Sequence, residues 1–354
     1  MFSGIRKRVK KAGQPPGTPI YTGSKKDTPP SIRVIVYSPS GYEEVEANRY
    51  CECEHLMNAQ GTIWVNVEGL YDIDLIKQLA TRFNLHPLTV EDILNTDQRP
   101  KVEEFEDYLF VTLKALDWKA DTKTFHVRQL SLILAKNFIL SFQEFDTTRF
   151  DQIRQKLHGT SQRLRDQGSD YLAYRLIDAV VDEYFFVLES MGDRIETVED
   201  KIIRYPTPQN SRTIYRLKRQ MLLLRKAIWP MREALSHLLH MEDDFITKFT
   251  RVYLRDVYDH TMQAIDTLET FRDMLSSLLD MYLSTITNRM NEIMKTLTVI
   301  TTIFIPITAI ASFYGMNFAD IPGLHWAQGY LAVLMVMIAL ACVMLIYFRH
   351  KRWL

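Results

Sequence analysis

Cysteine is scarce in this chain of 354 residues, which contains only Cys51, Cys53 and Cys342. Three cysteines are too few for a disulfide framework, and this usage is typical of a reducing cytoplasm. Cys51 and Cys53 stand close to His55, so a soft metal ion is one interpretation of this cluster. Because no second ligand pair follows at the spacing of a zinc site, we do not favour it.

The chain also lacks an excess of charge of either sign, because 43 Lys and Arg balance 43 Asp and Glu. A nucleic-acid-binding protein needs a basic face, so no nucleic-acid partner is expected. The sequence has no phosphate-binding glycine-rich loop, and we expect no nucleotide. An enzyme is not expected either, because the sequence assembles no nucleophile, base and orienting group from its scattered titratable residues.

Charged residues are absent from two C-terminal stretches, residues 296–313 and 329–348. Each is close to the roughly 20 residues that cross a bilayer, so the sequence predicts two transmembrane helices. The loop between them, residues 314–328, contains no Lys or Arg and one acid, Asp320. Basic residues flank the pair of spans, at Arg289, Lys295, Arg349, Lys351 and Arg352. The positive-inside bias therefore predicts cytoplasmic termini and an external loop.

One face of the first predicted span is semi-polar. Spacings of three and four group the residues Asn291, Met294, Thr298, Thr301, Ile305, Thr308 and Ser312. A single Thr or Ser in such a helix usually bonds its own backbone carbonyl or packs between helices. The whole stripe indicates instead a face that lines a conduit. One helix cannot enclose a channel, so this interpretation requires several copies around an axis.

The larger part of the chain precedes the spans. Residues 1–30 form a basic, Pro- and Gly-rich leader, and residues 31–168 are predicted to form an α/β domain. β-branched and aromatic residues favour strands over Ser31–Tyr37, Thr62–Val67, Tyr108–Leu116, Val127–Ala135 and Phe138–Phe142. Apolar spacing favours helices over Asp72–Phe83 and Leu88–Asn95.

Long helices are predicted from residue 169 onward. Residues 169–246 are expected to form two antiparallel helices, broken at Pro206 and Pro208. Residues 247–295 carry an apolar stripe with coiled-coil spacing and are predicted to form a stalk helix that leads into the first span. This stripe fits packing within one subunit as well as packing around an oligomer axis. Residues 349–354 form a basic tail.

Four sequence motifs together resemble the CorA family of divalent-cation transporters. Tyr314, Gly315, Met316 and Asn317 open the loop between the two spans, where this family carries its Gly-Met-Asn signature. The other motifs are the segments 90–95 (VEDILN) and 255–260 (RDVYDH) and the ending 351–354 (KRWL). A bare Gly-Met-Asn is a weak signal, but its position between two C-terminal spans makes the resemblance specific.

The resemblance implies a funnel-shaped homopentamer in the plasma (inner) membrane that takes up Mg²⁺, with Co²⁺ and Ni²⁺ as further ions. It implies a selectivity filter made of Tyr314, Gly315, Met316 and Asn317. It implies pore-lining and gating roles for Asn291, Met294, Leu297, Thr301, Ile305 and Thr308. Relatives often have Met where this chain has Ile305, so the chain departs from the family at that constriction. Outside this resemblance, Gly315 and Asn317 fit a turn that merely connects two helices.

The resemblance also implies a regulatory site for intracellular Mg²⁺ between neighbouring subunits. The matching acids are Asp92 and Asp256, with Glu91 and Asp178 nearby. Facing acids repel one another when no ion is bound, and bound Mg²⁺ neutralises them and favours a closed, symmetric assembly. From the residues alone, each acid is more simply a solvated charge or the partner of a base such as Arg255.

Two other functions stay open. One is a zinc transporter on the same scaffold, against which Met316 argues, because zinc transporters of this superfamily tend to carry Gly-Ile-Asn. The other is a non-conducting, membrane-anchored scaffold with a coiled-coil stalk, which predicts no ion flux.

Overall fold

The computed structural model describes residues 13, 15–23, 29–119, 121–122, 124–145, 147–159, 162–241, 244–317, 321–322 and 326–353. The chain divides into two compact units, Met1–Thr197 with Thr213–Leu275 and Val198–Arg212 with Ser276–Leu354. Three long helices contribute residues to both units, namely α7 (Ser169–Arg204), α8 (Pro208–His240) and α9 (Lys248–Tyr314).

A seven-stranded sheet forms the centre of the first unit, in the order β2-β1-β3-β7-β6-β5-β4. The strands are β1 (Ser31–Ser38), β2 (Gly41–Ala47), β3 (Thr62–Glu68), β4 (Lys101–Glu104), β5 (Leu109–Lys119), β6 (Thr124–Leu134) and β7 (Phe138–Gln143). Neighbouring strands are antiparallel except β3 and β7, which are parallel. All five predicted strands are present, and the predicted α/β class is confirmed.

Sequence reasoning missed the two edge strands, β2 and β4. Strand β2 reads GYEEVEA and β4 reads KVEE, so both are rich in charge and poor in β-branched residues. Charged side chains are typical of sheet edges, where they oppose pairing with other chains. Four short helical segments were also not predicted, namely α2 (Tyr50–Cys53), the 3₁₀ helix η1 (Glu54–Asn58), α5 (Asp151–His158) and α6 (Gln162–Arg165).

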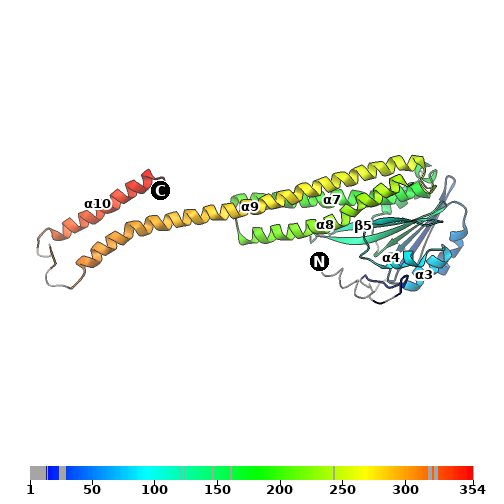
Figure 1. Ribbon diagram of the computed structural model, residues 1–354, viewed down its shortest axis with the longest axis horizontal. Helices are drawn as coiled ribbons and strands as arrows, with labels where there is room; N and C mark the ends of the chain where they lie inside the picture. Colours follow the sequence, from blue (N-terminus) through cyan, green and yellow to red (C-terminus); the bar gives the residue numbers. More distant parts are fainter. Residues whose placement is uncertain are drawn as a thin grey trace. The chain divides into compact units, whose positions relative to one another are not determined.

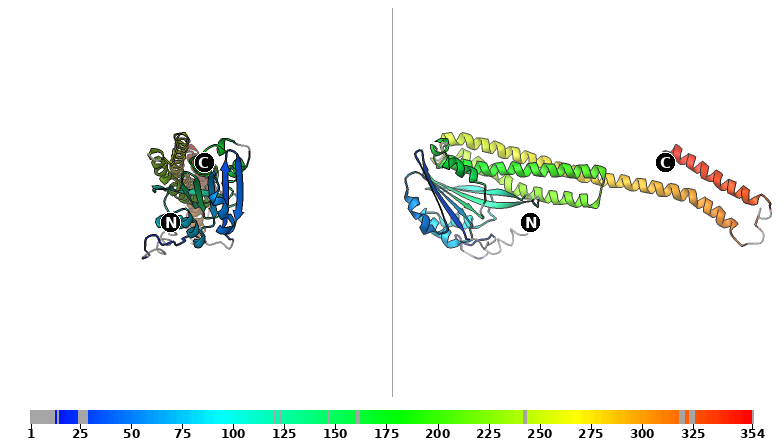
Figure 2. Two further views of the ribbon diagram at one scale, coloured as in Figure 1. Left: turned by 90° about the vertical axis from the view of Figure 1, so that its right-hand side faces the viewer. Right: turned by 180° about the vertical axis from the view of Figure 1, so that it is seen from behind.

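Helices cover both faces of the sheet (Figure 1 and Figure 2). On one face, α3 (Ile73–Arg82) and α4 (Pro87–Leu94) bury an apolar core with β1, β3 and β7. Asp72 caps α3 by accepting a hydrogen bond from the Leu75 N–H at 3.0 Å. Pro87 occupies the first turn of α4, and the His86 ring accepts from the Leu88 N–H. Both predicted helices are therefore present, and α4 positions Glu91 and Asp92.

The other face of the sheet packs against α7. The buried Tyr184 hydroxyl donates to the Lys114 carbonyl of β5, and Glu183 pairs with the buried Arg149. At the start of α7, the Asp170 carboxylate accepts from the Thr247 N–H at 3.0 Å and from the Thr247 hydroxyl at 2.7 Å. This pair joins the beginning of α7 to the beginning of α9, which fixes where the longest helix starts.

Two apolar helices dominate the second unit. Helix α9 runs to Tyr314 as a helix of 67 residues that continues through Pro306, and α10 covers Gly329–His350. Both are long and apolar enough to cross a membrane, and only 6% of the most apolar stretch of each is buried within one chain. Apolar surface of this extent needs lipid or other copies of the chain to cover it.

Candidate functional site

The end of α9 forms the turn that carries the Gly-Met-Asn motif. The Gly315 N–H donates to the Ala311 carbonyl at 3.0 Å, and the Met316 N–H donates to the Phe313 carbonyl at 3.4 Å. A Cβ atom at Gly315 would lie 3.1 Å from the Ala311 oxygen, so glycine allows this close approach of backbone to backbone. Tyr314, Met316 and Asn317 are exposed. Asp320 lies outside the described residues.

The six residues predicted to line a pore share one side of α9. Asn291, Met294, Leu297, Thr301, Ile305 and Thr308 are all exposed in the single chain. Three of them are large and apolar, and Met294, Leu297 and Ile305 are 54%, 51% and 64% exposed. A face of this kind, on a helix with a membrane-spanning composition, is free to meet copies of itself around an axis.

The hydroxyl groups on this face bond to their own helix. The Thr301 hydroxyl lies 2.8 Å from the Leu297 carbonyl, and the Thr308 hydroxyl lies 2.8 Å from the Phe304 carbonyl. Each hydroxyl donates its proton to the backbone, so its oxygen lone pairs remain as acceptors. An oxygen acceptor suits the water shell of a cation. The hydroxyls can therefore bond to their own backbone, and the same stripe can still line a conduit.

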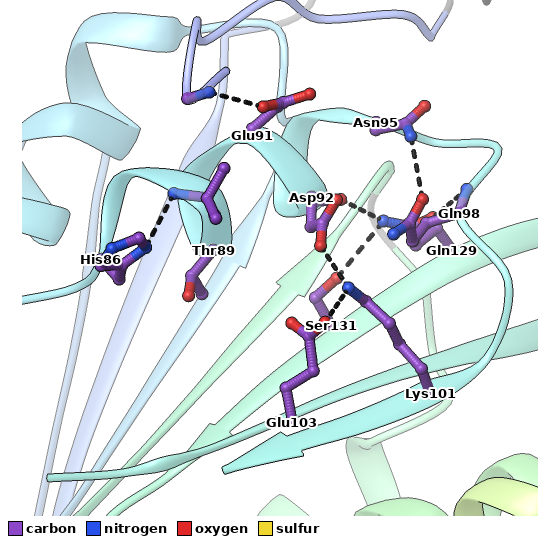
Figure 3. Close-up of polar contacts among 12 residues, drawn as sticks. His86, Thr89, Glu91, Asp92, Asn95, Gln98, Lys101, Glu103, Gln129 and Ser131 are labelled. Atoms are coloured by element: carbon purple, nitrogen blue, oxygen red, sulfur yellow. Dashed lines mark hydrogen bonds and ion pairs between the residues drawn. The ribbon is translucent and has the colours of Figure 1, made fainter. Parts of the chain in front are cut away.

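Asp92 on α4 belongs to a polar cluster with β4 and β6 (Figure 3). Its carboxylate lies 2.6 Å from the Lys101 ammonium, which also contacts Glu103. The Gln129 amide donates to the Asp92 carbonyl at 2.8 Å. Burial raises the pKa of Asp92, the hydrogen bond and charge of Lys101 oppose this rise, and the charges of Glu103 and Glu91 add to it. The cluster holds negative charge that one cation of the chain does not fully neutralise.

Glu91 points away from this cluster, although it is adjacent to Asp92 in the sequence (Figure 3). Its carboxylate accepts from the Gly17 N–H at 2.7 Å. Gly17 has a φ of +81°, and a Cβ there would lie 3.1 Å from the Cβ of Pro87. Glu91 therefore ties the leader segment to α4, which is a structural contact within the single chain.

Asp178 and Asp256 form a second acidic group, between α7 and α9. Asp178 pairs with Arg175 at 2.9 Å, and Asp256 lies 3.9 Å from the His260 ring in the expected pair on one helix face. Burial raises the pKa of Asp178, and the nearby charges of Asp182 and Asp256 raise it further. Asp256 is 65% exposed. An exposed acid beside a half-buried acid leaves room for a further ligand from outside the chain.

The predicted acids do not gather into one metal site within the described residues of a single chain. In the part of the chain that the structure describes, no group of three or more His, Cys, Asp or Glu side chains lies close enough to hold a metal ion. Cys53 is buried and donates to the Tyr50 carbonyl, whereas Cys51 is exposed. The prediction that Asp92 and Asp256 share Mg²⁺ across neighbouring copies stays a prediction.

Lys101, Gln129 and Arg175 are contacts of the predicted acids that sequence reasoning missed. Arg175 precedes Asp178 by one helical turn, so its spacing signalled the contact. Lys101 and Gln129 reach Asp92 only because β4 pairs with β5 and β5 with β6. No local sequence pattern indicates that Lys101 and Gln129 contact Asp92.

Comparison with known proteins gives concordant matches. The family model described as "CorA-like Mg2+ transporter protein" matches residues 59–351. The cobalt/magnesium transport protein CorA of Thermotoga maritima is 43% identical over 344 residues, which is 97% of this chain and 98% of the relative. The putative metal ion transporter YfjQ of Bacillus subtilis is 36% identical, covering 82% of this chain and 89% of the relative.

A solved structure shares the fold. The CorA magnesium transporter from Methanocaldococcus jannaschii superposes with a TM-score of 0.75 at 23% identity, covering 91% of this chain and 98% of that one. At this identity the match supports the fold alone. It covers both the α/β domain and the C-terminal apolar helices.

Proposed function

Because this chain belongs to the family of CorA-like Mg²⁺ transporters, we propose that it conducts Mg²⁺, and also Co²⁺ and Ni²⁺, across a membrane. This family consists of transporters and channels, so the chain is not an enzyme. The observation that carries the proposal is the position of the Tyr314–Asn317 turn, which joins the two helices long and apolar enough to cross a membrane. A filter at this position meets each ion as it enters.

The proposed filter binds a hydrated ion. Mg²⁺ prefers six oxygen ligands and loses its waters reluctantly, so a ring of amide oxygens can bind it through those waters. Asn317 from each copy supplies a side-chain carbonyl, and Gly315 keeps the backbone free of side-chain bulk. Binding through water is strong enough to select an ion and weak enough to release it.

Five copies around one axis are proposed to build the conduit, in accordance with the resemblance. The α9 faces of these copies would bring together rings of Met294, Leu297 and Ile305, which form apolar constrictions that gate by dewetting. The Thr301 and Thr308 oxygens between them would accept from the water shell of the ion. Lipid would cover the remaining apolar surface of α9 and α10.

The membrane potential supplies the driving force for uptake. A divalent cation gains roughly 4.6 kcal/mol per 100 mV when it moves to a negative interior. We place the protein in the plasma (inner) membrane with both termini cytoplasmic, on the basis of the basic residues that flank the spans. Uptake of this kind requires no nucleotide.

Intracellular Mg²⁺ is proposed to close the pore. Asp92 of one copy and Asp256 of the next would share an ion, with Glu91 and Asp178 nearby. Two observations support this arrangement: among the described residues the exposed Asp256 pairs only with the His260 ring, at 3.9 Å, and two carboxylates, Asp92 and Glu103, share the single ammonium of Lys101. Removing the ion leaves acids that repel across the interface, which loosens the ring.

Mg²⁺ flux into vesicles tests the proposal directly. The full-length protein is reconstituted in proteoliposomes with an inside-negative potential, and wild type is compared with Asn317→Ala. Potential-driven Mg²⁺ flux that the substitution abolishes is the expected result. Absence of flux from folded wild type would favour a non-conducting scaffold, and flux of Zn²⁺ in preference to Mg²⁺ would favour the zinc transporter.

A further inference from the structure

Helix α7 carries an acidic stripe on its outer side. Asp182, Phe186, Glu189, Asp193 and Glu196 follow one another at spacings of four, three, four and three, which places them on one face. All five are exposed, and Phe186 is 57% exposed. Within the described residues, none of the four carboxylates forms an ion pair with a base. We call this set the α7 stripe.

Helix α8 carries a stripe with the opposite charge and the same spacing. Tyr215, Arg219, Leu222, Lys226 and Trp229 also follow at four, three, four and three. Tyr215, Leu222 and Trp229 are 59%, 56% and 38% exposed and recur every seven residues, as in the seam of a coiled coil. Neither Arg219 nor Lys226 forms an ion pair with an acid in the described part of the chain. We call this set the α8 stripe.

Basic residues are concentrated at the end of α7 and over most of α8, although the chain has no net charge. Residues 201–232 contain Lys201, Arg204, Arg212, Arg216, Lys218, Arg219, Arg225, Lys226 and Arg232 and no acid. Burial lowers the pKa of Arg194 on α7, and the charge of Arg216 lowers it further. A surface of this kind is expected to attract an acidic partner.

The two stripes cannot meet within one chain. Each faces away from the apolar side of its own helix, which is buried in the first unit. On α7 the buried side includes Leu188, Met191 and Ile195, and on α8 it includes Met221, Leu224 and Ile228. Phe186 contacts the Trp118 ring and Trp229 contacts Arg225 within the chain, and both side chains stay exposed enough to contact a second molecule.

The two stripes lie at matching positions along the helix axes. The Arg194 guanidinium donates to the Gln220 amide oxygen at 3.0 Å, which sets the register between the antiparallel helices α7 and α8. Asp182 lies twelve residues before Arg194, and Arg232 lies twelve residues after Gln220. By the same count Phe186 is level with Trp229, Glu189 with Lys226 and Glu196 with Arg219, each within one residue or about 1.5 Å.

We propose that the α7 stripe of one copy packs against the α8 stripe of the next. Rotation about an axis parallel to the helices moves no residue along that axis, so residues level within one chain stay level between copies. Glu189 then meets Lys226, Glu196 meets Arg219, and Phe186 meets Trp229. Two different faces that complement each other form a head-to-tail contact, which is the kind that closes into a ring. The inference rests on the proposed function only in requiring several copies.

Cross-linking of engineered cysteines tests this contact in the full-length protein in membranes. Glu189→Cys and Lys226→Cys are combined in a background of Cys51→Ser and Cys342→Ala, and copper phenanthroline is added. A ladder of covalent oligomers is expected. The control combines Glu196→Cys with Lys226→Cys, which lie on the same two faces at different heights, and several-fold less oligomer is expected.

Three results would overturn the proposal. These are no oligomer from the matched pair, equal oligomer from both pairs, and a disulfide confined to monomers. Charge exchange gives a second test, because Glu189→Lys is expected to weaken assembly and Lys226→Glu in the same chain to restore it. Mg²⁺ flux is measured on the same samples. Normal flux without the cross-link would reject the contact alone, whereas absent flux with the cross-link would reject the transport function alone.

Discussion

The Lys101 ammonium lies 2.6 Å from the Asp92 carboxylate and is shared with Glu103. A cation of the chain itself thus stands where the proposed regulatory ion would bind. Lysine and Mg²⁺ compete for the same oxygen atoms, so Lys101 is expected to set how much intracellular Mg²⁺ is needed to close the pore.

Replacing Lys101 with Met should make inhibition more sensitive to Mg²⁺. The substitution leaves Asp92 and Glu103 without a shared cation, so a divalent ion gains attraction and meets no competitor. We expect half-maximal inhibition of flux at several-fold lower Mg²⁺ on the cytoplasmic side. Lys101→Arg keeps the charge and serves as the control. An unchanged inhibition curve in Lys101→Met would show that Asp92 does not belong to the regulatory site.

Inhibition by intracellular Mg²⁺ should weaken as the pH falls. This weakening should begin at a higher pH than it would if the acids had the pKa of an ordinary aspartate. The pKa values of Asp92 and Asp178 lie above 3.8, in both cases mainly because of burial. The folded protein binds these protons more tightly than the unfolded chain does, so the two groups lower stability at neutral pH and cease to do so as pH falls through the raised values. Protons displace Mg²⁺ over the same range.

The measurement is Mg²⁺-dependent thermal stabilisation as a function of pH. Stabilisation by Mg²⁺ is expected to decline as pH falls from neutral toward the raised pKa values. In Asp178→Asn the part of this decline that depends on Asp178 should be lost. A pH profile that is identical in wild type and in this variant would show that Asp178 does not contribute.

Arg149 should be costly to remove from the first unit. Its side chain is 3% exposed and joins Asp117 of β5, at 2.6 Å, to Glu183 of α7, at 2.7 Å. Arg149→Met removes the cation that pairs with Glu183, whose pKa burial already raises, and leaves Asp117 with the more distant Arg128, at 3.4 Å. Loss of a buried pair partner costs about 3–5 kcal/mol of unfolding free energy.

The control is an ion pair on the surface of the same unit. Arg99 and Glu233 pair at 3.0 Å, but their side chains are 70% and 80% exposed. Arg99→Met is expected to cost ~0–1 kcal/mol. Chemical denaturation of the full-length protein in detergent compares the two variants, and equal costs would contradict the assigned role of Arg149.

Local patterns in the sequence predicted the elements that depend on local residues. The apolar composition of residues 296–313 and 329–348 was enough to locate two long apolar helices, and the Gly-Met-Asn motif lies at the end of α9 as expected. Strands β2 and β4 were missed because their charged residues reflect an edge position, which only the whole sheet defines. The contact of Lys101 with Asp92 was missed for the same reason, since it depends on the pairing of β4 with β5.

Gly315→Ala should reduce transport without disrupting the fold. The added Cβ would lie 3.1 Å from the Ala311 oxygen, so the end of α9 must shift by a few tenths of an ångström. Asn317 follows two residues later and would move with it, which is expected to lower Mg²⁺ flux several-fold. Gly41→Ala meets the Ser38 hydroxyl at 3.3 Å in a hairpin of the first unit and should leave flux unchanged. Flux in Gly315→Ala equal to that of the wild type would show that transport does not depend on the close approach of Gly315 to the Ala311 oxygen.

The apolar constriction is expected to depend on Leu297. Leu297 is 51% exposed on the α9 face that is proposed to line the pore, and a ring of leucines there would exclude water in the closed state. Leu297→Asn is expected to wet this ring and raise Mg²⁺ flux several-fold at cytoplasmic Mg²⁺ concentrations that close the wild type. Ile310→Asn introduces the same amide on the opposite side of the helix and should not raise flux. Equal leakage from both variants would mean that the amide disturbs membrane packing in general, and closure as complete as in the wild type in Leu297→Asn would place the gate elsewhere on α9.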